Sequence, residues 1–198
     1  MIRSLLRWPL AIAMLVVLSG CAGSPRISFY TLDVSPPPEA ANGSASRLDI
    51  LLGPVTLPEI VDRPQLVLNT ADNRVEIVDT SRWAQPLKGE TARVLAANLA
   101  HDLGTQRVFL AGQGMAGVGE LDIRVAVDIL RFESRPGVEA TIEALWTVRR
   151  KEGGTLSGRS VVREVVQGDG YDPLVAAHGR ALARVSHDIA EAIRKGNF

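Results

Sequence analysis

The sequence predicts an α+β fold, in which a mostly antiparallel sheet with a C-terminal three-strand meander carries two main helices packed on it. Two observations predict it. Apolar and polar residues alternate over consecutive segments between residues 121 and 166, as they do in strands joined by short turns. Apolar residues recur every three or four positions at 87–103 and 172–195, which predicts two amphipathic helices. Strands and helices that are separated in this way along a chain favour the α+β class.

Shorter strands are expected in the first half of the chain. Residues 27–32 alternate in part and predict the first strand, whereas the polar, Pro-rich stretch 33–46 predicts an exposed loop. Further strands are expected at 48–55, with Gly53-Pro54 bending its end, and at 65–68, 74–78 and 107–111. Pro58 and Pro64 fix the backbone on either side of a short turn. Asp72-Asn73 predicts the turn of a hairpin.

Both helices have recognisable ends and apolar stripes. Leu95, Leu99 and Leu103 form the stripe of the first, and Gly104 is suited to the position just after it. Asp172-Pro173 is expected to provide the N-cap and first residue of the second. Its apolar face consists of Leu182, Val185, Ile189 and Ile193, and Gly196 ends it.

The three meander strands are expected at 121–132, 138–148 and 155–166. The alternation changes phase at Ile129-Leu130, which indicates a β-bulge or an end to one-sided burial. Residues 151–154, with Gly153-Gly154, predict the turn between the last two strands.

Residues 1–20 have the features of a bacterial export signal: Arg3 and Arg7 precede an apolar run that ends at Leu18. Leu18-Ser19-Gly20-Cys21 resembles the lipobox of bacterial lipoproteins. In such lipoproteins a diacylglycerol is attached to the cysteine thiol, the signal is cut before it, and the new N-terminus is acylated. We therefore expect a signal peptide at 1–20, a lipidated tether at 21–26 and one domain at 27–198.

The alternatives for Cys21 are a transmembrane anchor or a free core thiol. The apolar run is shorter than the roughly 20 residues that span a bilayer, which favours lipidation. Ala22 follows the cysteine, and by resemblance to enterobacterial lipoproteins this favours the outer membrane over the inner one. Cys21 is the only cysteine, so no intrachain disulfide supports the domain.

Charge and motif spacing disfavour nucleic-acid binding, catalysis and metal or cofactor binding. Beyond the signal the chain has 20 basic and 22 acidic residues, a net charge of −2, which provides no basic field for nucleic acid. The glycine motif at 112–117 is followed by an expected strand instead of the helix that a dinucleotide needs. Ser186-His187-Asp188 contains triad residue types, but consecutive helix positions point apart. His178 is expected to be a packed histidine, and no metal-ligand spacing is present.

Trp83 has two interpretations. It stands beside Arg82 and shortly before Pro86, just ahead of the first expected helix. It either packs this helix onto the sheet or provides a contact for a partner protein, since tryptophan is enriched in both settings.

Five segments together resemble the auxiliary lipoproteins of ABC-type intermembrane transport systems, the paraquat-inducible protein C family. The matching segments are the lipobox, Phe29–Leu32, Val55–Leu68, Arg82–Leu87 and the last helix, in this order along nearly the whole mature chain. Ile60 departs from the pattern, because an aromatic residue is expected there.

The resemblance implies a periplasm-facing lipoprotein of the outer membrane that serves as a docking subunit for an MCE-domain protein, which carries lipids between membranes. A ring of identical subunits is one arrangement that it implies, and no catalysis is. The residues expected to contact the partner are Leu57, Pro58, Asp62, Arg63, Pro64 and Trp83. Two alternatives stay open: a periplasmic carrier that binds lipid itself, and a structural lipoprotein of another envelope assembly.

Overall fold

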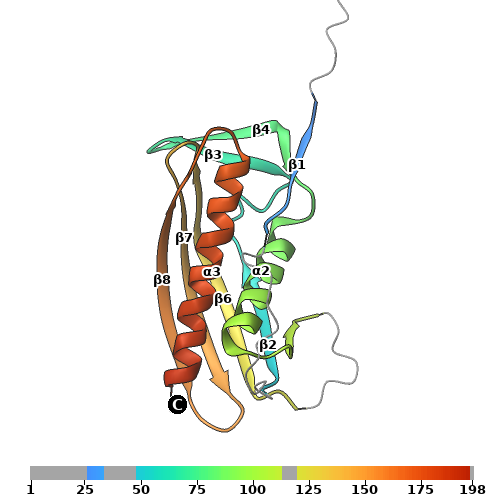
Figure 1. Ribbon diagram of the computed structural model, residues 1–198, viewed down its shortest axis with the longest axis vertical. Coiled ribbons are helices and arrows are strands. Elements are labelled where there is room, and N and C mark those ends of the chain that lie inside the picture. Colours follow the sequence, from blue (N-terminus) through green and yellow to red (C-terminus); the bar gives the residue numbers. More distant parts are fainter. Residues whose placement is uncertain (1–25, 34–47, 113–119, 197–198) are drawn as a thin grey trace, which may run out of the picture.

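The computed structural model describes residues 26–33, 48–112 and 120–196. Its larger sheet has five strands in the order β5-β2-β6-β7-β8. Their bounds are Val108–Leu110 for β5, Ile50–Thr56 for β2, Ile123–Arg135 for β6, Glu139–Arg150 for β7 and Thr155–Val165 for β8. Two helices, α2 (Leu87–Leu103) and α3 (Asp172–Lys195), lie side by side on one face of this sheet (Figure 1).

A smaller sheet of three strands lies across one end of the larger one (Figure 1). Its strands are β1 (Ser28–Tyr30), β4 (Arg74–Trp83) and β3 (Gln65–Ala71), in the order β1-β4-β3. Strands β3 and β4 form the expected antiparallel hairpin, whereas β1 joins the edge of β4 in parallel. The end of the molecule opposite to this sheet carries the hairpin between β7 and β8 (Figure 1).

The C-terminal meander has the expected form. Strand β7 pairs antiparallel with both β6 and β8 along almost its whole length. The register between β6 and β7 shifts between Ile129 and Arg131, so Leu130 is the extra residue of a bulge. The phase change in the sequence is therefore confirmed as a β-bulge, and it turns Leu130 outward.

The helices also follow the prediction, with one correction at the start of α3. Gly104 ends α2 in the left-handed conformation, with a φ of 62°. Asp172 was expected as the N-cap of α3, but it is already helical and Tyr171 holds the cap position. No side chain caps this end, so Asp172 contributes its negative charge to the first turn instead.

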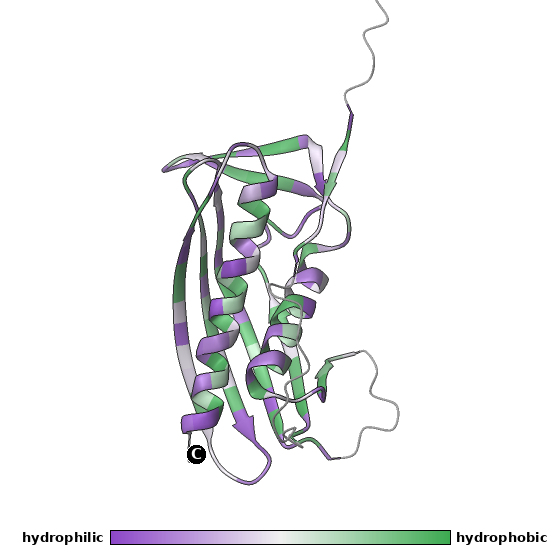
Figure 2. Cartoon of the chain, viewed as in Figure 1, coloured by the Kyte–Doolittle hydropathy of each residue, from purple (hydrophilic) through white to green (hydrophobic). Residues whose placement is uncertain are grey.

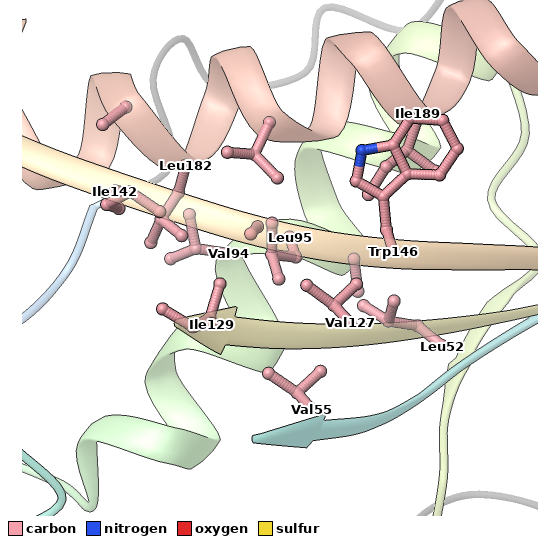
Figure 3. Close-up of a cluster of buried hydrophobic side chains, with 14 of the residues drawn as sticks. Leu52, Val55, Val94, Leu95, Val127, Ile129, Ile142, Trp146, Leu182 and Ile189 are labelled. Carbon is pink, nitrogen blue, oxygen red and sulfur yellow. The ribbon is translucent and has the colours of Figure 1, made fainter. Parts of the chain in front are cut away.

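One large apolar cluster joins the helices to both sheets. Figure 3 shows Leu182 and Ile189 of α3 and Val94 and Leu95 of α2 facing side chains from β2, β6 and β7. The expected apolar face of α3 is fully buried. Both helices carry strongly hydrophilic bands (Figure 2), as expected for helices with one face in water.

The α+β class, the meander and the two packed helices are confirmed. The chain divides its strands between two sheets, and β2 pairs in parallel with both β5 and β6. Strand β4 extends to Trp83, five residues beyond the expected end at Val78. The lipobox, most of the expected 33–46 loop and all but the first residue of the 112–117 glycine motif lie outside the described residues.

Candidate functional site: the Trp83 pocket

Backbone hydrogen bonds bring three of the quoted sequence segments together. The N–H of Trp83 donates to the carbonyl of Pro64 at 2.7 Å, and the N–H of Ala84 donates to the carbonyl of Tyr30 at 2.8 Å. The turn before Pro64 is closed by bonds from the N–H groups of Val61 and Asp62 to the carbonyl of Pro58. The segments around residues 30, 64 and 83 therefore meet at one corner of the three-stranded sheet.

A pocket of about 390 Å³ lies at this corner. We call it the Trp83 pocket; it is lined by Asp62, Arg63, Pro64, Trp83, Ala84, Gln85, Pro86 and Leu87. Its walls are mainly apolar, with the charged groups of Asp62 and Arg63 among them. Pro64 and Pro86 restrict the backbone on two sides of the pocket, which favours a preformed cavity.

Trp83 is the buried wall of the pocket. Only 6% of it is exposed, and its ring meets Phe132 edge to face with centroids 6.4 Å apart. Phe132 in turn stacks on His178 of α3 at 4.1 Å. Trp83 is therefore a packed side chain that contacts Phe132 of β6, and it also lines the pocket. Its replacement by alanine tests folding as much as contact, because it removes a large core side chain.

Arg63 has the most distinctive environment in the pocket. The side chain is half-buried, its Nε is inaccessible to water, and this N–H has no hydrogen-bond partner among the described residues. A buried donor without a partner costs roughly 1–3 kcal/mol. The residue is still partly open to solvent, and its guanidinium carries four further N–H donors for an acceptor from a partner. Asp62 beside it is exposed.

Four of the six expected contact residues line this pocket, and two do not. Leu57 packs against the main core. Pro58 borders a separate hollow of about 140 Å³, together with Ile60, Val75 and Leu130. The turn 57–64 thus separates two surfaces, and Ile60, where an aromatic residue was expected, belongs to the second one.

The pocket also includes residues of the matching segment Arg82–Leu87 that the sequence analysis did not predict as contacts. Ala84, Gln85 and Pro86 are exposed at its rim, and Leu87 closes it from the start of α2. Pro86 immediately before a helix was the available signal, because it holds residues 84–87 in an extended approach to the first helical turn. The second hollow had no local signal, since its residues come from four separated segments.

The triad residue types on α3 point to different partners. The Ser186 hydroxyl donates to the Leu182 carbonyl, His187 lies 3.5 Å from an Asp102 carboxylate oxygen, and Asp188 accepts from Ser160. The expectation that they diverge is confirmed. His178 is buried as expected, and burial lowers its pKa to about 3. Within residues 26–33, 48–112 and 120–196 no cluster of three or more metal-ligating side chains occurs.

The chain matches the family of ABC-type transport auxiliary lipoprotein components over residues 30–190, and it belongs to that family. It is 26% identical to the intermembrane transport lipoprotein PqiC of Escherichia coli K12 over 191 residues, which cover 96% of this chain and 98% of that protein. The chain is therefore an auxiliary lipoprotein of intermembrane transport. Among its described residues, neither helix has the length and apolar character needed to cross a bilayer.

Two crystal structures share the fold. An uncharacterized protein superposes with a TM-score of 0.68 at 23% identity, over 85% of this chain and 99% of its own. A protein from Xanthomonas campestris superposes with a TM-score of 0.64 at 20% identity, over 83% of this chain and 94% of its own.

Proposed function

We propose that this lipoprotein is an outer-membrane-anchored, periplasm-facing docking subunit for an MCE-domain protein of an ABC-linked lipid transport system. The observation that carries the proposal is the Trp83 pocket, where residues 62–64 and 83–87, from two of the segments that resemble the family, line a cavity of about 390 Å³. Docking is a binding role without catalysis, and a mainly apolar pocket with a few polar groups suits it.

Arg63 indicates the chemistry of the partner group. Its guanidinium is a half-buried cation with several N–H donors, and a carboxylate or a carbonyl oxygen suits such a group. Trp83, Pro64 and Pro86 favour an apolar side chain next to that acceptor. A short partner segment with an acidic or backbone acceptor beside an apolar residue meets both conditions.

The proposed anchor is a set of acyl chains on Cys21. The family consists of lipoproteins, and Cys21 is the only cysteine in the chain, at the end of an export signal. Two or three acyl chains hold a protein on a membrane durably, whereas a single chain binds only marginally. Ala22 after the cysteine supports the outer membrane as the destination.

A pull-down of the full-length acylated protein from gently solubilised envelopes tests the docking role. We expect an MCE-domain protein to be recovered with the wild type. We expect its recovery to fall severalfold with Arg63→Glu, because this change places a carboxylate where the pocket offers a donor. The folded state of each variant is checked by thermal unfolding.

Arg163→Glu provides the matched control. Arg163 is exposed on β8 and forms no side-chain hydrogen bond or ion pair within the described part of the chain. The same charge change at this position is expected to leave recovery unaltered. Equal recovery with all three proteins contradicts a role for the Trp83 pocket. Recovery of lipid at fixed stoichiometry, without an MCE-domain protein, favours a carrier instead.

A further inference from the structure

Strand β1 and the residue just before it expose two large apolar side chains that the fold does not use. Phe29 is 65% exposed although β1 is held in register against β4, and Ile27, which precedes the strand, is 48% exposed. Ser28 and Tyr30 alternate with them along the chain and point to the other side of the strand. There Tyr30 packs edge to face on Tyr171. Ile27 and Phe29 therefore share the outer face of the three-stranded sheet.

The position of β1 in the chain places this face close to the proposed lipid anchor. Only residues 22–26 separate Cys21 from Ile27. Six fully extended steps along the chain span roughly 20 Å at most. Strand β1 is also the edge of the three-stranded sheet, at the end of the molecule opposite to the β7–β8 hairpin (Figure 1). A membrane that holds acyl chains on Cys21 is thus always within reach of Ile27 and Phe29.

We infer that Ile27 and Phe29 insert into the bilayer beside the acyl chains, at the boundary between headgroups and hydrocarbon. This inference rests on the proposed acylation of Cys21. Arg26 is exposed next to Ile27, and Arg82 lies directly opposite Phe29 on β4. Guanidinium groups that flank an inserted aromatic residue suit the phosphate groups of lipids. The contact surface is therefore a lipid headgroup layer, with Arg26 and Arg82 at its level.

The size of the surface favours a bilayer over a second copy of the chain. A stable protein interface buries about 800 Å² on each partner, whereas an aromatic side chain buries roughly 150–250 Å². Ile27 and Phe29 alone provide much less than an interface needs. An acyl anchor already supplies most of the membrane affinity, so a small additional contact suffices to fix the orientation.

This contact has a consequence for the Trp83 pocket. The carbonyl of Tyr30 accepts the N–H of Ala84, a residue that lines the pocket. Insertion of the preceding residues therefore holds the pocket at a fixed height and direction above the membrane. Without this contact, the acyl chains alone fix neither the height nor the direction of the pocket.

Site-directed spin labelling of the acylated protein in phospholipid vesicles tests the inference. Cys21 is the only cysteine and its thiol is blocked by the acyl chain, so Phe29→Cys introduces the single free thiol. Thr155→Cys is the control, because Thr155 is exposed at the start of β8, beside the hairpin at the opposite end. The accessibility of each label to oxygen, which concentrates in hydrocarbon, is compared with that to a water-soluble nickel complex. The intact mass first establishes the acyl chains on Cys21.

We expect the oxygen-to-nickel accessibility ratio at position 29 to be several times that at position 155. A label at position 29 that is as accessible to nickel as the control overturns the inference and leaves the anchor intact. A label that is protected from both reagents indicates contact with a second protein chain and also overturns it. A mass without acyl chains overturns the anchor as well, which separates the two failures.

Discussion

At the scale of single residues, His178 is a titratable side chain that is almost completely removed from water. It is buried on α3, its Nε2 lies 2.8 Å from the Ser134 hydroxyl, and its ring stacks on Phe132. Its Nδ1 is buried without a hydrogen-bond partner among the described residues. Because no acid lies close enough to favour the charged form, desolvation alone lowers its pKa from 6.5 to about 3.

This pKa makes the stability of the fold depend on pH. Below about pH 6.5 the unfolded chain binds a proton on His178 that the folded chain does not bind. The contribution of His178 to the free energy of unfolding is therefore complete above pH 6.5 and is lost as the pH falls towards 3. The slope is about 1.4 kcal/mol per pH unit. We expect His178 to lower the free energy of unfolding by ~2 kcal/mol between pH 7 and pH 5, measured by urea denaturation.

One variant isolates the contribution of His178. His178→Gln retains a side chain that can bond the Ser134 hydroxyl but does not titrate, so we expect a flatter dependence on pH even if its stability at pH 7 is lower. A wild type and a His178→Gln variant with equal slopes would show that the buried ring takes up its proton in the folded state.

At the scale of elements, the pairing of β7 with β8 depends on a glycine. Gly158 lies directly opposite Trp146, and a Cβ atom at position 158 overlaps the six-membered ring of Trp146. Moving this ring aside breaks the hydrogen bond that its Nε1 donates to the Ser160 hydroxyl at 3.1 Å. We expect Gly158→Ala to lower the free energy of unfolding by about 1–3 kcal/mol, measured by chemical denaturation.

The control is a glycine on α2. A methyl group at Gly89 meets nothing within 4 Å, and alanine is the better helix former. Gly89→Ala should therefore leave stability unchanged or raise it by up to about 1 kcal/mol. If Gly158→Ala behaves in the same way, the tryptophan ring has another position available and the proposed steric fit is wrong.

Elements with a local signal could be predicted from the sequence, and the contacts between distant elements could not. The helices followed from apolar spacing and Gly104, and the bulge followed from the phase change at Ile129-Leu130. The parallel pairing of β1 with β4 joins residues more than 50 positions apart, and no local pattern specifies it. The extension of β4 to Trp83 depends on its bond to the Pro64 carbonyl, which is equally non-local.

The candidate site shows the same difference between local signals and distant contacts. The sequence predicted four residues of the pocket, because two Pro-containing segments each indicated a contact surface and the fold places them side by side. These residues are Asp62, Arg63, Pro64 and Trp83. Pro58 and Leu57 were grouped with them by proximity along the chain, but the turn directs them to other surfaces. The exposure of Phe29 was not predicted, because alternation in a short edge strand does not show which face is covered.

At the scale of the whole molecule, two sheets share one core. The main apolar cluster contains Leu66 and Trp83 from the three-stranded sheet, Val127 and Trp146 from the five-stranded sheet, and residues of both helices. Neither sheet covers its inner face alone. The Trp83 pocket and the outer face of β1 both belong to the three-stranded sheet, so both proposed contacts are supported by the rest of the fold through this cluster.

A shared core predicts that the two sheets unfold together, because exposing one inner face removes the cover of the other. The chain has three tryptophans, and Trp8 lies in the predicted signal. The mature protein therefore retains Trp83 in one sheet and Trp146 in the other, one fluorescent probe for each. Trp146→Phe leaves the first probe and Trp83→Phe leaves the second.

We expect the fluorescence curve of each variant to coincide with its own far-ultraviolet circular dichroism curve in denaturant, although the midpoints of the two variants differ. A fluorescence transition at Trp83 that precedes the loss of secondary structure would show instead that the three-stranded sheet, with both proposed contact surfaces, opens as an independent unit.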